Sequence, residues 1–376
     1  MSRVVRWLAE LVELPSINPA FAPPGDARAG EQRVAGYVSE RARQAGLEVE
    51  LQPVQDGRCN VLVRLLPPAA ARHRVVLAPH MDTVSVVEER QLRPRRQGNR
   101  LYGRGACDTK ASLAAMLSAL VHLASARRRP RQTEIVLAAV VDEEFAQAGS
   151  RRLAAEGWAV DLAVVGEPTR LRVVTAHKGS VWVRISAGGR AAHAATPWQG
   201  RNAIEQIARV ILAVQDEYAR SLGRRRHALL GTPTVSVGRV GGGTQPNIVA
   251  DQAWVELDRR TLPGESTRSV VRELVALLHR HGWPASVRPL ARAECPPLET
   301  ATTHPWVARF LRAMRQRRGR GVPYFCDAAI LASAGMPAVV YGPGNIAQAH
   351  TSQEWVDVAE VEQAERRLCG FLESLP

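Results

Sequence analysis

Apolar positions in the first 170 or so residues follow two periods, one typical of amphipathic helices and one typical of buried strands. Helical spacing predicts helices over residues 2–14, 29–44 and 111–120. Short aliphatic and β-branched runs predict strands over residues 48–52, 60–65, 74–78, 135–141 and 162–165. Alternation of this kind predicts a doubly wound α/β domain.

The pattern changes between about residues 174 and 289. We predict strands and helices in the order of a small four-stranded α+β unit, over residues 181–185, 202–222, 234–240, 253–257, 266–281 and 286–288. Helix and strand signals then alternate again over residues 305–315, 328–334, 338–341 and 358–372. We therefore expect one α/β domain, formed by residues 1–174 and 290–376, that is interrupted by an inserted domain at residues 175–289.

Composition agrees with a two-domain protein that lies outside the membrane. The chain has 376 residues, 45% of them hydrophobic, and contains no apolar stretch near the roughly 20 residues that span a bilayer. Its first residues read as an amphipathic helix rather than as an export signal, so we expect a cytoplasmic location. The five cysteines are scattered and never form a Cys-x-x-Cys pair, which favours neither a disulfide framework nor a thiolate zinc site.

The formal net charge of +14 comes almost entirely from arginine, because Lys110 and Lys178 are the only lysines. Arginine clusters at 127–129, 224–226 and 315–320 fall between predicted elements, without interleaved aromatic residues. We interpret them as solvated surface and expect no nucleic-acid partner. The alternative from another class is a non-catalytic, nucleic-acid-associated protein, for which steeply salt-dependent DNA binding and an absence of zinc would be the signature.

Residues suited to metal chemistry follow three predicted strands. His80 and Asp82 follow the first, Glu143 and Glu144 the second, and Glu167 the third. Since the carboxyl ends of strands in an open α/β sheet share one edge, these side chains are expected to meet there. Imidazole and carboxylate groups are ligands that zinc accepts. Adjacent strand-end glutamates point opposite ways, so one could hold a metal while its neighbour moves a proton, although a solvated acidic loop is the alternative.

Two further residues extend this set. Asp108 follows the glycine-bracketed turn 103–105 at a predicted helix start, where it is either a helix cap or a metal ligand. His350 follows Gly342-Pro343-Gly344 and supplies a second imidazole.

The chain resembles the zinc aminoacylase and carboxypeptidase family, peptidase family M20, which includes acetylornithine deacetylase and succinyl-diaminopimelate desuccinylase. The matching segments run in the family's order over residues 80–84, 101–110, 142–144, 166–169 and 341–351. The resemblance implies a zinc-exopeptidase-like domain with an inserted lid that also serves for dimerisation. It further implies a small-molecule substrate, an N-acyl amino acid, and a homodimer formed through the lid.

The resemblance also implies two Zn²⁺ ions, for which Co²⁺ or Mn²⁺ could substitute. Asp108 would bridge them, with His80 and Glu167 completing one site and Glu144 and His350 the other. A cis peptide bond after Asp108 is part of the same resemblance.

Catalytic roles follow from the same match. Glu143 becomes the general base, which takes a proton from water activated between the metals, and Asp82 orients the ring of His80. His193, in the segment 189–195, would reach the partner subunit's site and stabilise the oxyanion.

The residues implied in substrate binding lie in both domains: Arg260, Asn247, Asn202, Gly342 and Gly344. A guanidinium fork suits a substrate carboxylate, so Arg260 is expected to bind that group.

The implied reaction is hydrolysis of an N-acyl amino acid. Segments 244–251 and 342–355 favour a deacetylase of the acetylornithine type, and hence arginine biosynthesis, over a desuccinylase; a dipeptidase or carboxypeptidase shares every metal ligand. The chain departs from the family pattern at 86–89 and 94–96, where the usual proline, tryptophan and Asp-Pro-Phe are replaced, and at Cys326, where threonine is common.

Overall fold

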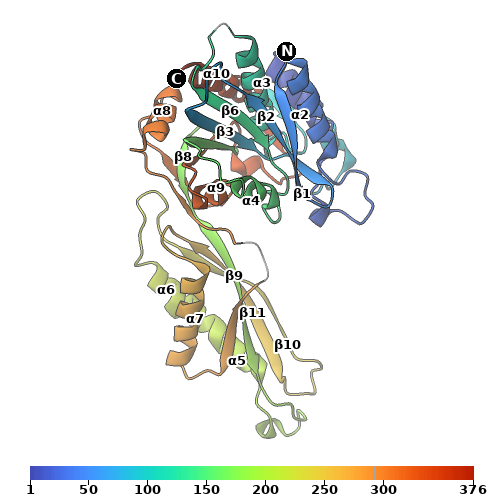
Figure 1. Cartoon of the computed structure of the whole chain (residues 1–376). Coiled ribbons are helices and arrows are strands. Elements are labelled where there is room, and N and C mark those ends of the chain that lie inside the picture. Colours follow the sequence, from blue (N-terminus) through green and yellow to red (C-terminus); the bar gives the residue numbers. More distant parts are fainter. Residues whose placement is uncertain (127, 291–293) are drawn as a thin grey trace. The chain divides into compact units, whose positions relative to one another are not determined.

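The computed structural model describes residues 1–126, 128–290 and 294–376, which form two compact units. The larger unit comprises Met1–Thr175, Thr300–Arg320 and Cys326–Pro376. The smaller unit comprises Ala176–Glu299 and Gly321–Phe325 (Figure 1).

The largest sheet is mixed and has nine strands. Its hydrogen-bonded order is β1 (Glu48–Gln55), β2 (Arg58–Leu65), β6 (Thr133–Ala139), β3 (His73–Pro79), β7 (Leu162–Gly166), β15 (Ala338–Val340), β8 (Val174–His177) and β13 (Leu298–Glu299), with β14 (Arg320–Val322) also paired to β8. Strands β6, β3, β7 and β15 are mutually parallel, whereas β1, β2 and β8 pair antiparallel with their neighbours. The predicted α/β class is confirmed.

Helices lie over both faces of this sheet (Figure 1). One face carries α2 (Gln32–Gln44), α3 (Lys110–Ser125) and α10 (Val358–Glu373), and α1 (Arg3–Val12) packs against α3 and α10. The other face carries α4 (Ala148–Ala154) and α9 (Ala328–Ser333), while α8 (Pro305–Ala313) contacts α10. The sequence pattern missed α4, a single short helix.

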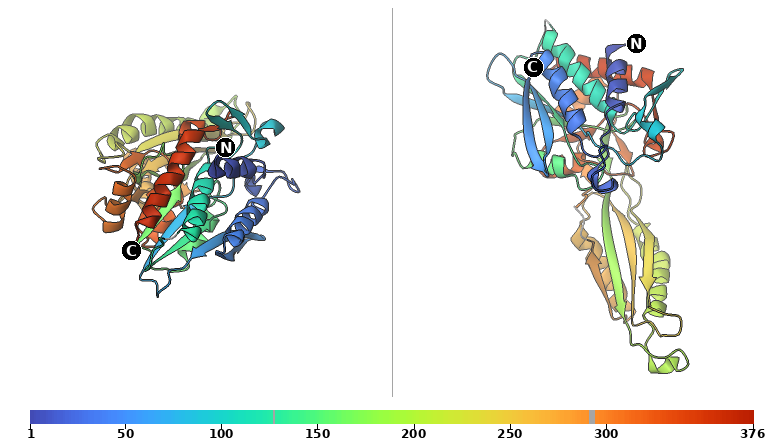
Figure 2. Two further views of the ribbon diagram at one scale, coloured as in Figure 1. Left: turned by 90° about the horizontal axis from the view of Figure 1, so that it is seen from above. Right: turned by 90° about the vertical axis from the view of Figure 1, so that its right-hand side faces the viewer.

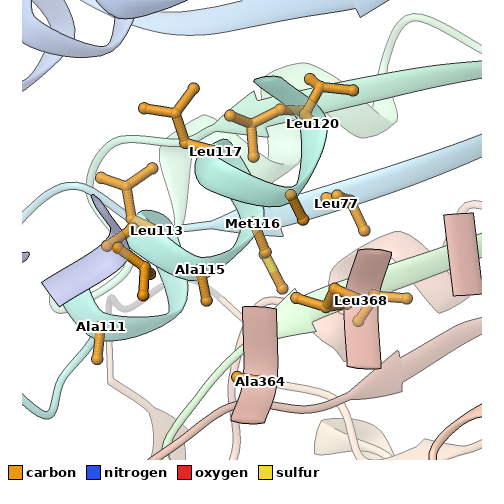
Figure 3. Close-up of a cluster of buried hydrophobic side chains, with 14 of the residues drawn as sticks. Leu77, Ala111, Leu113, Ala115, Met116, Leu117, Leu120, Ala364 and Leu368 are labelled. Atoms are coloured by element: carbon orange, nitrogen blue, oxygen red, sulfur yellow. The ribbon is translucent and has the colours of Figure 1, made fainter. Parts of the chain in front are cut away.

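The core of the larger unit is centred on α3, which lies beside α10 in the view from above (Figure 2). Thirteen of the sixteen residues of α3 are buried, so this helix is apolar on nearly every side. Figure 3 shows its packing against β3 and α10 through Leu77, Leu113, Met116, Leu120, Ala364 and Leu368, among others. Helix α3 begins at Lys110, two residues after Asp108, and this packing therefore fixes the backbone close to that residue.

A small antiparallel sheet was not predicted. It contains β16 (Trp355–Asp357), β5 (Arg100–Tyr102) and β4 (Arg95–Gln97). These strands are short, and β4 is exposed throughout, so they lack the apolar alternation by which strands are recognised.

The smaller unit is an antiparallel sheet ordered β10 (Thr234–Gly242), β11 (Gln252–Thr261), β9 (Gly179–Gly188) and β12 (Ala285–Pro289). Helices α5 (Ala203–Ala213), α6 (Ala219–Leu222) and α7 (Thr267–Arg280) accompany it. The single helix predicted over 202–222 differs in that a π-helical turn, Val214–Tyr218, separates α5 from α6. No helix in the described ranges is long and apolar enough to cross a membrane.

Candidate metal centre

Three neighbouring parallel strands deliver the acidic and imidazole side chains. β3 pairs in parallel with β6 on one side and with β7 on the other, so their carboxyl ends lie together. His80 follows β3, Glu143 and Glu144 follow β6, and Glu167 follows β7 directly. The strands thus bring these four residues to one edge of the sheet, where the sequence pattern predicted them.

Asp108 arrives from the loop before α3. This loop turns at Gly105, where φ is +80° and an added Cβ would lie 2.9 Å from Lys110 Cδ, so a side chain is disfavoured twice over. The peptide bond between Asp108 and Thr109 is cis, as the resemblance implies. Thr109, not Asp108, occupies the N-cap position of α3. The helix-cap alternative for Asp108 is therefore not what the structure shows.

The two carboxylate oxygens of Asp108 face different imidazoles. Oδ1 lies 3.1 Å from His80 Nε2, and Oδ2 lies 3.3 Å from His350 Nε2. A second carboxylate lies near the same nitrogen of each ring: Glu167 Oε1 is 3.9 Å from His80 Nε2, and Glu144 Oε2 is 3.1 Å from His350 Nε2. Asp108 therefore has the position of a bridging group between two clusters.

Each cluster offers three potential ligand atoms that lie within 4.8 Å of one another. One cluster is His80, Asp108 and Glu167, which are all buried; the other is Asp108, Glu144 and His350, of which His350 is exposed. A catalytic zinc site typically has three nitrogen or oxygen ligands from the protein and leaves a fourth coordination position open for water or substrate.

The crowding of carboxylates in these clusters also indicates a cation site. Burial, together with the negative charge of Asp108, raises the pKa of Glu167 well above its usual value. Burial also raises the pKa of Glu144 to about 7, despite a hydrogen bond from His350 that acts in the opposite direction. Since a divalent cation would offset the repulsion among these carboxylates, the cluster is suited to holding one.

The imidazoles respond in the opposite sense. Hydrogen bonds to Asp108 and Glu144 raise the pKa of His350 to about 10. Burial opposes protonation of His80, but Asp108, Asp82 and Glu167 still raise its pKa well above the usual value. Burial works against ionisation of Asp108 as well, yet both imidazoles hold the pKa of its carboxyl below the usual range. The imidazoles thus favour a positive charge at the same place where the carboxylates would favour a cation.

An orphaned atom supports the fit to a metal. Glu167 Oε1 is buried and has no hydrogen-bond partner among the residues that the structure describes. Leaving a buried carboxylate oxygen unpaired is costly, and a bound cation would satisfy it. The residues present therefore fit a pair of divalent cations.

Asp82 holds both His80 and the acidic turn. Its Oδ1 lies 3.4 Å from His80 Nδ1 and accepts the Glu143 N–H at 3.1 Å. Its Oδ2 accepts the Glu144 N–H at 3.1 Å and the Asn18 side-chain amide at 2.8 Å. The sequence analysis assigned Asp82 only to the imidazole; the structure adds the backbone from which Glu143 and Glu144 extend.

A buried polar network behind Asp82 was not predicted. Asn18 Nδ2 also donates to Asp142 Oδ1 at 2.9 Å, and so one amide joins two carboxylates. Arg58 Nη1 reaches Asp142 Oδ1 at 3.1 Å, and the Arg58 guanidinium is paired with Glu31. Nothing in the spacing of these residues marks them, although a polar residue next to a proline, as in Asn18-Pro19, was an available signal for an ordered turn.

Glu143 is differently placed from its neighbour. Its carboxylate accepts no hydrogen bond within the part of the chain that is described, while Glu144 contacts His350. Burial and the nearby charge of Glu167 raise the pKa of Glu143 well above its usual value. A half-buried carboxyl group with a raised pKa and no hydrogen bond to its oxygens has the properties of a group that can accept and return a proton.

The glycines expected to bind substrate lie in the larger unit. An added Cβ on Gly342 would be 2.2 Å from Ser112 Oγ and 2.5 Å from Glu167 O, so only glycine allows this close approach. The Gly344 N–H donates to Glu360 Oε2 at 2.7 Å.

The other four residues predicted for substrate or transition-state contacts lie in the smaller unit. His193 is exposed, and its Nδ1 accepts the Ala195 N–H at 3.0 Å. Asn247 lies next to this segment, because its carbonyl accepts the Ala194 N–H. Asn202 caps α5 through bonds from the N–H groups of residues 204 and 205.

Arg260 is engaged by its own neighbours. Its Nη2 lies 3.0 Å from Asp258 Oδ2, and its guanidinium carbon lies 5.5 Å from the centre of the Phe325 ring. The Arg260 guanidinium therefore already has one carboxylate partner, Asp258.

Comparison with known proteins agrees with this geometry. The profile of peptidase family M20/M25/M40 matches residues 76–374. The chain is 29% identical to acetylornithine deacetylase of Proteus mirabilis, over 96% of this chain and 94% of that protein. It is 31% identical to acetylornithine deacetylase of Yersinia pseudotuberculosis, over 90% of this chain and 88% of that protein.

Solved structures share the fold. Aminopeptidase PepT of Bacillus cereus superimposes with a TM-score of 0.80 at 22% identity, covering 99% of this chain and 97% of that one. The YXEP protein of Bacillus subtilis, described as a dinuclear metal-binding peptidase, gives a TM-score of 0.72 at 14% identity, again covering 99% and 97%. With most of its length matched by the family profile, this chain belongs to peptidase family M20/M25/M40 and is a hydrolase of amide bonds.

Proposed function

We propose that this protein hydrolyses the amide bond of an N-acyl amino acid, with N-acetylornithine as the first substrate to test. The observation that carries the proposal is the position of Asp108, whose two oxygens face His80 Nε2 and His350 Nε2, with Glu167 and Glu144 near the same nitrogens. Relatives named acetylornithine deacetylase, at about 30% identity over nearly the whole chain, support the choice of substrate.

The proposed cofactor is a pair of divalent cations, zinc in the first instance. His80, Asp108 and Glu167 would hold one, and Asp108, Glu144 and His350 the other. Bound there, the cations would polarise the acyl oxygen and lower the pKa of a water molecule.

Glu143 is the residue proposed to transfer the proton. Its carboxylate takes one proton from the attacking water, whose oxygen forms a bond to the acyl carbon. When the carbon–nitrogen bond breaks, Glu143 returns that proton to the leaving nitrogen. The products are a carboxylic acid and the free amino group, so atoms and protons balance. Asp82 supports this role because it fixes the backbone N–H of Glu143.

We propose that Arg260, Asn202 and Asn247 of the smaller unit contribute to substrate binding, with Arg260 bound to the α-carboxylate. Gly342 and Gly344 of the larger unit are also proposed to bind substrate. His193 would stabilise the oxyanion in the site of a second copy, which makes a homodimer part of the proposal. Residues 1–174 and 290–376 would be the catalytic domain, and residues 175–289 the lid. A cytoplasmic location and a place in arginine biosynthesis stay predictions.

The decisive experiment is a hydrolysis panel on zinc-loaded and cobalt-loaded protein. It compares N-acetylornithine, other N-acetyl amino acids, N-succinyl-diaminopimelate and dipeptides, with chelator-treated protein as the control. We expect metal-dependent release of ornithine, with the highest kcat/KM for N-acetylornithine. Preference for a succinylated substrate or a dipeptide would refute the choice of acyl group. A folded, metal-loaded protein that cleaves none of them would refute the proposal itself.

A further inference from the structure

We propose that Glu354 is a positioning residue that joins the loop carrying Asp108 to the segment carrying His350, and so sets the spacing of the two cation sites. This inference rests on the metal centre of the proposed function. Glu354 belongs to neither ligand cluster and has no role in the reaction described above.

Both oxygens of the Glu354 side chain are bound by the loop before α3. Oε1 accepts the N–H groups of Cys107 at 2.9 Å and Asp108 at 3.0 Å. Oε2 accepts the Gly105 N–H at 3.1 Å and the Arg104 guanidinium at 2.6 Å. All four donors lie within five consecutive residues, and Glu354 itself is buried, with 2% of its surface exposed.

Three of these four bonds go to the backbone, and one goes to Asp108 itself. The carboxylate therefore fixes the main chain from which the Asp108 side chain extends, rather than merely neutralising Arg104. Charge-assisted hydrogen bonds of this kind are stronger than those between neutral groups. The backbone of Glu354 contributes too, because its carbonyl accepts the Gly103 N–H at 3.1 Å.

At its other end, Glu354 is close to His350 along the chain. Only three residues separate them, and Trp355, which follows Glu354, pairs with Tyr102 where β16 meets β5. The His350 ring is exposed and contacts Asp108 and Glu144 through Nε2, so its position also depends on how the segment that carries it is anchored. A shift of Glu354 would move both Asp108 and His350, which ligate through atoms only 3.3 Å apart.

The contact pattern makes an unusually sharp test possible. Both Glu354 oxygens meet only donors, whereas glutamine would present one oxygen and one NH₂ group. Whichever way the amide turned, N–H would face N–H. Glu354→Gln thus keeps the volume of the side chain and disrupts the loop.

A matched control exists at the opposite end of the sheet. Glu134, at the start of β6, is also buried and is bound by two arginines, Arg64 at 2.8 Å and Arg74 at 2.7 Å. Glu134→Gln removes a buried carboxylate of the same kind without touching either ligand loop.

The experiment measures zinc affinity by calorimetry on the full-length protein, and the visible spectrum after cobalt loading. Partners that orient metal ligands typically contribute about 10–100-fold to affinity. We expect Glu354→Gln to weaken zinc binding by that factor and to alter the cobalt spectrum, and Glu134→Gln to change neither. A purely structural role would lower the melting temperatures of metal-free and zinc-loaded protein equally, whereas a positioning role reduces the increase in melting temperature that zinc produces.

The outcomes separate this inference from the proposed function. Wild-type protein that binds no zinc or cobalt overturns both. Wild-type binding with unchanged zinc affinity in Glu354→Gln overturns this inference alone. If that variant does not fold, Glu354→Asp decides, since it keeps the charge but is one methylene too short to reach all four donors. Unchanged affinity and an unchanged cobalt spectrum in Glu354→Asp would then overturn the inference.

Discussion

Replacing Asn18 with alanine tests the buried network behind the metal centre. The Asn18 amide donates to Asp82 and Asp142 at 2.8 and 2.9 Å, and all three side chains are buried. Its carbonyl oxygen also accepts the Ala20 N–H at 3.0 Å and so caps the short 3₁₀ helix Pro19–Phe21. Alanine removes all three bonds and leaves two neighbouring carboxylates without the donor that joins them.

The magnitude follows from these contacts. A hydrogen bond to a charged group contributes about 1.5–3 kcal/mol, so losing two costs about 3–6 kcal/mol. The cap adds about 0.5–2 kcal/mol, which must be subtracted. Asn345→Ala is the matched control, because Asn345 caps the 3₁₀ helix Ile346–Gln348 through the Ala347 N–H at 3.2 Å. Its side chain donates to no carboxylate among the described residues.

The assay is hydrogen exchange of the metal-free protein, read by mass spectrometry on peptides from β3 and β6. A local readout is preferable because a chain of two compact units need not unfold in one step. We expect the free energy of opening in these strands to fall by about 3–6 kcal/mol more in Asn18→Ala than in Asn345→Ala. A difference below about 1 kcal/mol would refute the conclusion that the Asn18 amide stabilises this buried network.

Three further predictions concern the metal centre. Glu143→Ala should lower kcat by about 10²–10⁴-fold while zinc content, measured by elemental analysis, stays at the wild-type level; retained activity would exclude the proposed base. Because the pKa of His350 is raised to about 10, its charged form stabilises the metal-free protein fully below about pH 6.5, and this contribution is lost as the pH rises toward 10. Zinc requires the neutral ring, so calorimetry at pH 8 in buffers of different ionisation enthalpy should show proton release on binding; an uptake of protons would contradict this. Gly342→Ala should destabilise the protein by about 1–3 kcal/mol in urea unfolding, since the new methyl group meets Ser112 and the Glu167 carbonyl, whereas Gly370→Ala, which has open space, should not.

The sequence was sufficient to predict which side chains gather at the sheet edge. His80, Glu144 and Glu167 each follow an apolar strand, and parallel pairing brings strand ends together whatever the rest of the chain does. The position of Asp108 could not be derived in this way, because it depends on the conformation of a loop. The local sequence left open whether Asp108 is a helix cap or a metal ligand, and only the family resemblance implied the ligand role.

The residues behind these side chains were beyond prediction for a different reason. Asn18 lies 124 positions from Asp142, and Glu354 lies 246 positions from Asp108. Contacts of this kind depend on tertiary packing and leave no periodic pattern along the chain. The interruption of the helix after Ala213 is similar, since a π-helical turn keeps the apolar spacing close to that of a continuous helix.

The larger unit is built from three separate segments of the chain, and this affects when it can fold during synthesis. β15 lies between β7 and β8, and α10 packs on α3, so the middle of this unit stays open until the ribosome has released almost the entire chain. Nearly all of the smaller unit, by contrast, is one continuous stretch that emerges earlier. His350 emerges only after the other four proposed metal ligands. Nascent chains therefore expose the apolar surface of α3 for most of translation, which is the period when chaperones would be needed most.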